Sequence, residues 1–124
     1  MNSSHYFYRN IIFSKQGKEI SLIDINDPSQ NEKLDPWFGM VIQLADGQHT
    51  LNQFYSFMKS QYNGSTPPNI DETLESVVKR MVEAKFIILS EEKVNLPYYL
   101  SMPHEMLDIE KAKKLLAKDR EKVN

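Results

Sequence analysis

The 124-residue sequence contains no cysteine. This absence excludes disulfide bonds, thiolate nucleophiles and the cysteine ligand sets of zinc and iron–sulfur sites. Its four glycines are isolated from one another, so no glycine-rich phosphate-binding loop is present. The longest unbroken apolar run, Phe86 to Leu89, is far too short to span a membrane.

Neither basic nor acidic residues are in large excess. The 15 basic and 17 acidic residues give a net charge of −2, whereas nucleic-acid binding usually requires a clustered basic surplus. No basic segment followed by a long apolar stretch opens the chain, so the start does not resemble a secretion signal. We therefore expect a cytoplasmic protein with no nucleic-acid partner and no membrane association.

The N-terminal third predicts a small antiparallel β-sheet. Residues 5–13 are rich in aromatic and β-branched side chains, which favour strands. Residues 14–18 have the composition of a hairpin loop, and residues 20–25 return as a second strand. Residues 31–34 are a candidate third strand.

Three helices are predicted after residue 35, where the apolar spacing changes from two to about 3.6. Asp35–Pro36 is a typical helix start, and Thr50 with Gln53 forms a capping-box pattern. Asn69 or Asp71 is the expected cap of the third helix, after a break at 63–68. The three apolar faces consist of Trp37, Met40, Val41 and Leu44, then Leu51, Phe54, Tyr55 and Met58, then Ile70, Leu74, Val77, Val78, Met81 and Val82.

Residues 86–96 suggest a terminal hairpin or wing, so the predicted fold is α+β: a small N-terminal antiparallel sheet, three helices in a winged helix-turn-helix-like order, and a C-terminal amphipathic helix. We expect a domain at 1–97 and a connector with a charged helix at 98–124. The apolar stripe of that helix is narrow: Met106, Ile109, Ala112 and Leu116. It is expected either to dock weakly through Met106 and Ile109 or to project toward a partner.

Groups for catalysis are not arranged in a recognisable motif. The three histidines, His5, His49 and His104, lie far apart in the sequence and lack the spacing of a helical metal site. The acidic residues fall at helix starts, strand ends and turns, where each has a structural explanation. We expect no enzyme activity, no metal and no cofactor.

Two segments together resemble a known family. One runs from Leu34 through Asp35-Pro36-Trp37 to Asp46-Gly47 and Thr50-Leu51, and the other from Ile70-Asp71 to Phe86-Ile87-Ile88. They are similar to the PqqD-like peptide chaperones, also called RiPP recognition elements. Lys85 stands where that family usually has glycine, and residues from Tyr98 onward have no counterpart in its minimal members.

The resemblance implies a non-catalytic module that binds the leader of a ribosomally made precursor peptide and presents it to a modifying enzyme, such as a radical SAM maturase. In this family the leader adds as a strand to a sheet edge and packs against the third helix, a mode known as β-augmentation. It implies an edge strand of Asn31, Glu32, Lys33 and Leu34, and a groove wall of Val78, Lys79, Met81 and Val82.

Two alternatives remain from the residues alone. A winged-helix transcriptional regulator would use the third helix for DNA, yet its Lys79, Arg80 and Lys85 are outnumbered by Asp71, Glu72, Glu75 and Glu83. The chain could instead be an assembly subunit whose C-terminal helix docks on a larger enzyme.

Overall fold

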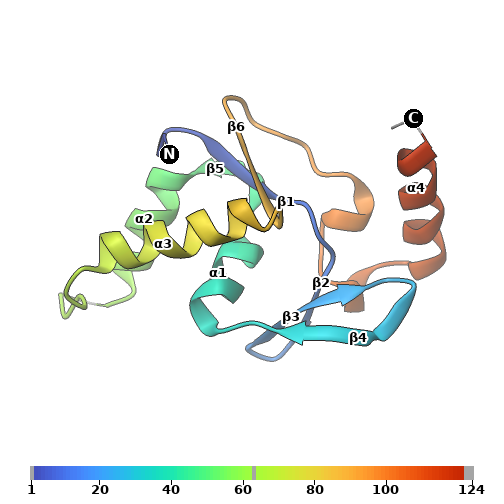
Figure 1. The fold of residues 1–124 in the computed structure, drawn as a ribbon, viewed down its shortest axis with the longest axis horizontal. Coiled ribbons are helices and arrows are strands. Elements are labelled where there is room, and N and C mark those ends of the chain that lie inside the picture. The colour runs from blue at the N-terminus through green and yellow to red at the C-terminus, as the bar shows by residue number, and fades with distance from the viewer. Residues whose placement is uncertain (1, 63, 122–124) are drawn as a thin grey trace.

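The computed structural model describes residues 2–62 and 64–121. Within them the chain forms two antiparallel three-stranded sheets and four α-helices, arranged as Figure 1 shows. The expected α+β class is confirmed. The first residue of the predicted break at 63–68 and the predicted helix end at Lys122 lie outside the described residues.

One sheet has the strand order β2-β3-β4 and contains β2 (Phe13–Gln16), β3 (Glu19–Asp24) and β4 (Asp27–Lys33). A hairpin and a third strand are confirmed, but their bounds differ from the prediction. Residues 14–16, predicted as hairpin loop, belong to β2, and β4 begins four residues before the predicted 31–34 and ends before Leu34. The predicted single strand 5–13 is wrong at its C-terminal end. The neighbouring apolar residues Ile12 and Phe13 pack in different core clusters, so they cannot continue the alternating pattern of one strand.

The first three helices are α1 (Pro36–Leu44), α2 (Leu51–Ser60) and α3 (Ile70–Glu83). The capping box of α2 is confirmed: Gln53 N–H donates to Thr50 Oγ1 at 3.2 Å, and Thr50 N–H donates to Gln53 Oε1 at 2.8 Å. Of the two predicted cap residues of α3, Asn69 is confirmed as the N-cap and Asp71 is not. Asn69 occupies the cap position in the left-handed region (φ 60°) without a side-chain cap bond, and Asp71 lies in the first turn.

The second sheet has the order β5-β1-β6 and contains β1 (Tyr6–Arg9), β5 (Asp46–Thr50) and β6 (Ile87–Ser90). The predicted hairpin within 86–96 is therefore wrong. The strand β6 pairs with β1 along its whole length, from Tyr6 opposite Ser90 to Arg9 opposite Ile87. Residues 91–97 instead leave the sheet, with Val94 N–H donating to the Gly47 carbonyl at 2.9 Å.

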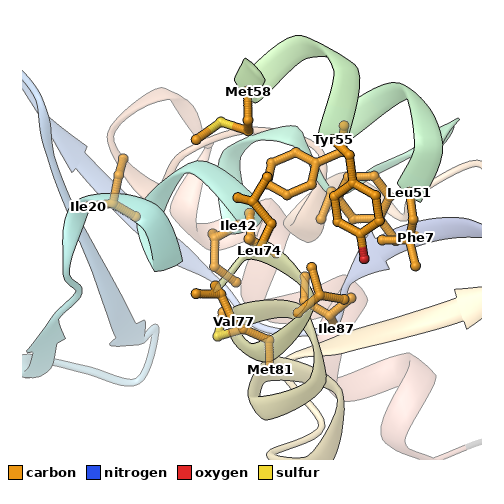
Figure 2. Close-up of a cluster of buried hydrophobic side chains, with 14 of the residues drawn as sticks. Phe7, Ile20, Ile42, Leu51, Tyr55, Met58, Leu74, Val77, Met81 and Ile87 are labelled. Carbon is orange, nitrogen blue, oxygen red and sulfur yellow. The ribbon is translucent and has the colours of Figure 1, made fainter. Parts of the chain in front are cut away.

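The main core lies where α1, α2 and α3 meet the two sheets, and Figure 2 shows its side chains converging from these elements. Phe7 of β1 packs edge-on against Phe54 of α2, with ring centroids 5.5 Å apart. Gly39 of α1 allows close approach to β3, because a Cβ there would lie 3.1 Å from Ile20 Cβ. The predicted apolar faces supply most of this core, since Leu51, Phe54, Tyr55 and Met58 of α2 are all buried.

A second core joins the C-terminal segment to the N-terminal sheet. The short 3₁₀ turns η1 (Tyr98–Leu100) and η2 (His104–Met106) lead into α4 (Ile109–Glu121). Buried side chains from both parts of the chain meet there: Ile12, Ile25, Tyr99, Leu100, Leu107 and Ala112. The helix is docked, but not through Met106, which is 68% exposed because it lies on the η2 turn before the helix.

Arg9 links the two cores from a nearly buried position, with 4% of its surface exposed. Its Nε donates to the Leu100 carbonyl at 2.7 Å, and its Nη1 donates to the Ile42 carbonyl at 3.1 Å near the end of α1. The guanidinium carbon lies 4.8 Å from the centre of the Phe13 ring. Burial lowers the pKa of Arg9 to about 10, against the opposing charge of Asp46, so the side chain stays protonated at neutral pH.

Candidate functional site

The β2–β3–β4 sheet has one covered edge and one open edge. At the β2 edge, Glu105 accepts a hydrogen bond from Lys15 N–H at 2.9 Å and another from the Ser14 hydroxyl. Burial acts to raise the pKa of Glu105, but these two hydrogen bonds, a third from its own main chain and the charge of His104 together hold the pKa below its usual value. At the opposite edge, every residue of β4 is exposed.

The hydrogen-bond register shows which main-chain groups of β4 are free. Leu34 N–H donates to the Ile20 carbonyl at 2.9 Å, and the register places Lys33 opposite Ser21 and Asn31 opposite Ile23. Main-chain groups of successive residues in an antiparallel strand point to opposite sides. The N–H and C=O groups of Asn31 and Lys33 therefore point away from β3, toward the open edge.

The side chains of β4 protect this edge from indiscriminate pairing. Pro28 has no N–H to offer, and Lys33 Nζ forms an exposed ion pair with Glu19 at 2.9 Å. The side-chain amide of Asn31 donates to the Ser29 carbonyl at 3.3 Å. Proline and charge are common on edge strands because they discourage aggregation. The edge is thus open only over a short stretch near Asn31 and Lys33.

A cleft of about 730 Å³ lies beside this stretch. From β4 it is lined by Gln30, Asn31 and Glu32. Its apolar lining continues through Leu22, Ile11 and Phe86. Phe86 lies three residues after the C-terminal end of α3, donates its N–H to the Met81 carbonyl at 3.0 Å, and is half-buried. The cleft therefore connects the open strand edge to the end of the third helix.

The C-terminal segment lines the same cleft. Tyr99 and Leu100 come from the connector, and Leu116, Asp119 and Arg120 come from α4. The Tyr99 hydroxyl donates to Asp119 Oδ2 at 2.8 Å. Burial and this hydrogen bond to the carboxylate together raise the pKa of Tyr99 to about 12.

The predicted site residues separate into two groups. Asn31, Glu32 and Lys33 lie on the open strand, and Leu34 follows it, half-buried against the main core. On α3, Lys79 is exposed and Val82 is half-buried. Val78 and Met81 are core residues with 0% and 2% of their surface exposed, so neither side chain offers a peptide any surface.

The position of α1 explains the burial of Val78 and Met81. This helix packs against both β3 and α3, and Figure 1 shows it between the β2–β3–β4 sheet and α3. The middle of α3 is consequently covered.

Sequence reasoning missed the contribution of Ile11, Phe86 and the C-terminal segment to the cleft. The one available signal was the aromatic pair Tyr98–Tyr99, which is unusual for a simple linker.

The described residues offer no metal centre, since no group of three or more His, Asp or Glu side chains in them could hold an ion. His49 Nδ1 lies 3.0 Å from Asp46 Oδ1, which is a local contact within β5. In the same part of the chain, no helix has both the length and the apolar character that a membrane span requires.

Comparison of the chain with protein-family models, with curated proteins and with solved structures finds no match.

Proposed function

We propose that this protein is a non-catalytic, cytoplasmic peptide-binding module that takes up a precursor peptide as an added strand on β4. The observation that carries the proposal is the open edge at Asn31 and Lys33, with Asn31 also lining a cleft whose walls are partly apolar. Strand addition gains affinity from main-chain hydrogen bonds and specificity from pockets for alternate side chains. Both requirements have a structural counterpart in this molecule.

The proposed role within a pathway rests on the resemblance to the PqqD-like peptide chaperones. The peptide would be a ribosomally made precursor, and the module would present it to a modifying enzyme such as a radical SAM maturase. Val78 and Met81 are buried and cannot form the predicted groove wall. In the proposal the cleft between β4 and Phe86 takes the place of that wall. Lys79 and Val82 stay in the proposal only as secondary contacts beyond Phe86.

The test uses synthetic peptides encoded by short reading frames beside the gene, titrated into the isotopically labelled full chain. We expect amide NMR shifts to concentrate at residues 29–34, with weaker ones at Leu22 and Phe86. Shifts elsewhere, or no binding by any of these peptides, would contradict the proposal. A neighbouring gene for a peptide-modifying enzyme would identify the enzyme to which the peptide is presented. A neighbourhood without short reading frames would count against the proposal that the bound peptide is a ribosomally made precursor.

A further inference from the structure

The cleft beside β4 has a wall that strand addition alone does not require. Leu116, Asp119 and Arg120 of α4 line it together with Glu32 of β4. A peptide strand paired with β4 would thus meet side chains of the C-terminal helix as well as those of the sheet.

This wall is held in place at both ends of the helix. Near its start, Asp108 N–H donates to the Tyr98 hydroxyl at 2.8 Å, and Lys111 Nζ lies 4.4 Å from the centre of the Tyr98 ring. Near its end, Asp119 accepts the hydrogen bond from Tyr99. Between them, Ala112 is fully buried. The adjacent tyrosines therefore fix α4 against the domain.

The charged side chains that line the cleft are predominantly acidic. Asp24, Glu32 and Asp119 face a single base, Arg120. Glu32 is exposed and has no ion-pair partner in the part of the chain that the structure describes. The lining between these groups is apolar and includes Ile11, Phe86 and Leu116.

We infer that α4 is a specificity wall of the cleft, and that the bound strand places an apolar side chain near Leu116 and Phe86 and a lysine or arginine near Glu32 and Asp119. This inference rests on the proposed function, because it assigns the chemistry of the peptide bound there. Alternate residues of a strand face the same side. The basic residue should therefore lie two positions from the apolar one.

The test pans a random peptide library displayed on phage against the full chain. Selected peptides are expected to share a basic residue two positions from a large apolar one. Their affinities are then compared by fluorescence anisotropy for Glu32→Gln, Asp119→Asn and Arg120→Gln. Asp119→Asn keeps an oxygen that can accept the Tyr99 hydrogen bond, so the position of the helix should be preserved.

Each loss of an acid should weaken binding by roughly two- to fivefold, the range typical of partly exposed ion pairs. Loss of Arg120 should strengthen binding of the same peptides, which a merely structural role of α4 would not produce. Glu110→Gln is the matched control: this residue of α4 is exposed and does not line the cleft, so affinity should be unchanged. The differences should shrink at high salt.

The outcomes separate this inference from the proposed function. One outcome is that the selected peptides bind Lys33→Pro more weakly but bind the α4 variants as they bind wild type, or that they lack a basic residue. Either result would contradict the role of α4 as a specificity wall and would leave strand addition on β4 supported. Panning that yields no binder, or binders indifferent to Lys33→Pro, overturns both. Self-association of the chain that Lys33→Pro abolishes would assign the edge to a second copy and would also overturn the inference.

Discussion

Arg9 Nε donates a hydrogen bond of 2.7 Å to the carbonyl oxygen of Leu100, ninety-one positions later in the chain. The same guanidinium also reaches the carbonyls of Ile42, Gln43 and Ala45 at the end of α1. One buried side chain thus joins the first strand, the first helix and the connector to the C-terminal helix.

Replacing Arg9 should therefore be costly. Arg9→Met removes the side-chain donor to the buried Leu100 carbonyl and to the Gln43 carbonyl, while the carbonyls of Ile42 and Ala45 keep main-chain donors. We expect a loss of about 2–4 kcal/mol in the free energy of unfolding. Urea denaturation followed by circular dichroism measures this. Arg80→Met on the exposed side of α3 is the control and should change stability by less than about 0.5 kcal/mol. Equal effects of the two substitutions would contradict the linking role of Arg9.

Gly47 should not tolerate a side chain. Its φ is +77°, and a Cβ at this position would overlap the carbonyl oxygen of Val94. Gly47→Ala should lower the free energy of unfolding by about 3 kcal/mol, because left-handed strain and a steric clash act together. Gly17 also has a positive φ, of +63°, but open space around it. Gly17→Ala should cost only about 1 kcal/mol, and similar losses at both sites would argue against the Val94 contact.

Removal of residues 104–124 should leave a folded domain of reduced stability. The truncation exposes Ile12 and Ile25 of the second core but leaves the main core intact. We expect a loss of roughly 2–5 kcal/mol at about 25 cal/mol per Å² of apolar surface. The truncated chain should still unfold in one cooperative urea transition. A non-cooperative transition would mean that the C-terminal segment belongs to the same folding unit as residues 1–97.

The burial of Tyr99 and its hydrogen bond to Asp119 should make stability depend on pH in the alkaline range. The pKa of Tyr99 is about 12 in the folded protein, whereas tyrosine in an unfolded chain ionises near pH 10. As the pH rises, the unfolded state therefore loses this proton first. The contribution of the Tyr99 hydroxyl to the free energy of unfolding is complete below pH 10 and is lost as the pH approaches 12.

Comparison with Tyr99→Phe isolates this contribution, because Arg9 titrates in the same range with the opposite sign in both proteins. The stability difference between wild type and Tyr99→Phe should shrink as the pH rises from 10 to 12. Unfolding curves at several pH values measure it. A difference that stays constant over this range would show that Tyr99 is not held in its protonated form.

Local patterns in the sequence predicted the elements that depend on near neighbours. The capping box of Thr50 and Gln53, the apolar face of α2 and the β2–β3 hairpin follow from spacings of a few residues, and all three are present. The pairing of β6 with β1 is different. Ile87 could pair with any strand that offers a free edge, and nothing near it in the sequence indicates Arg9 as its partner.

The residues of the candidate site divide in the same way, into those that local sequence predicts and those that depend on long-range contacts. The strand at Asn31–Lys33 could be predicted from its position between a turn and a helix. Helical periodicity identified Val78 and Met81 as apolar positions of α3, but it could not distinguish a groove from a core, because that depends on how α1 packs. The roles of Phe86 and Leu116 in the cleft depend equally on long-range contacts.

The most direct test of strand addition compares Lys33→Pro with Lys33→Ala in the full chain. Both variants lose the exposed ion pair with Glu19, but only proline removes the N–H that points to the open edge. With the peptide that gives the strongest NMR response among those encoded beside the gene, calorimetry should show Lys33→Ala binding within about twofold of wild type. Lys33→Pro should bind at least about tenfold more weakly, since the added strand then faces a missing donor. Equal affinity of the two variants would contradict the central claim that β4 receives a peptide strand.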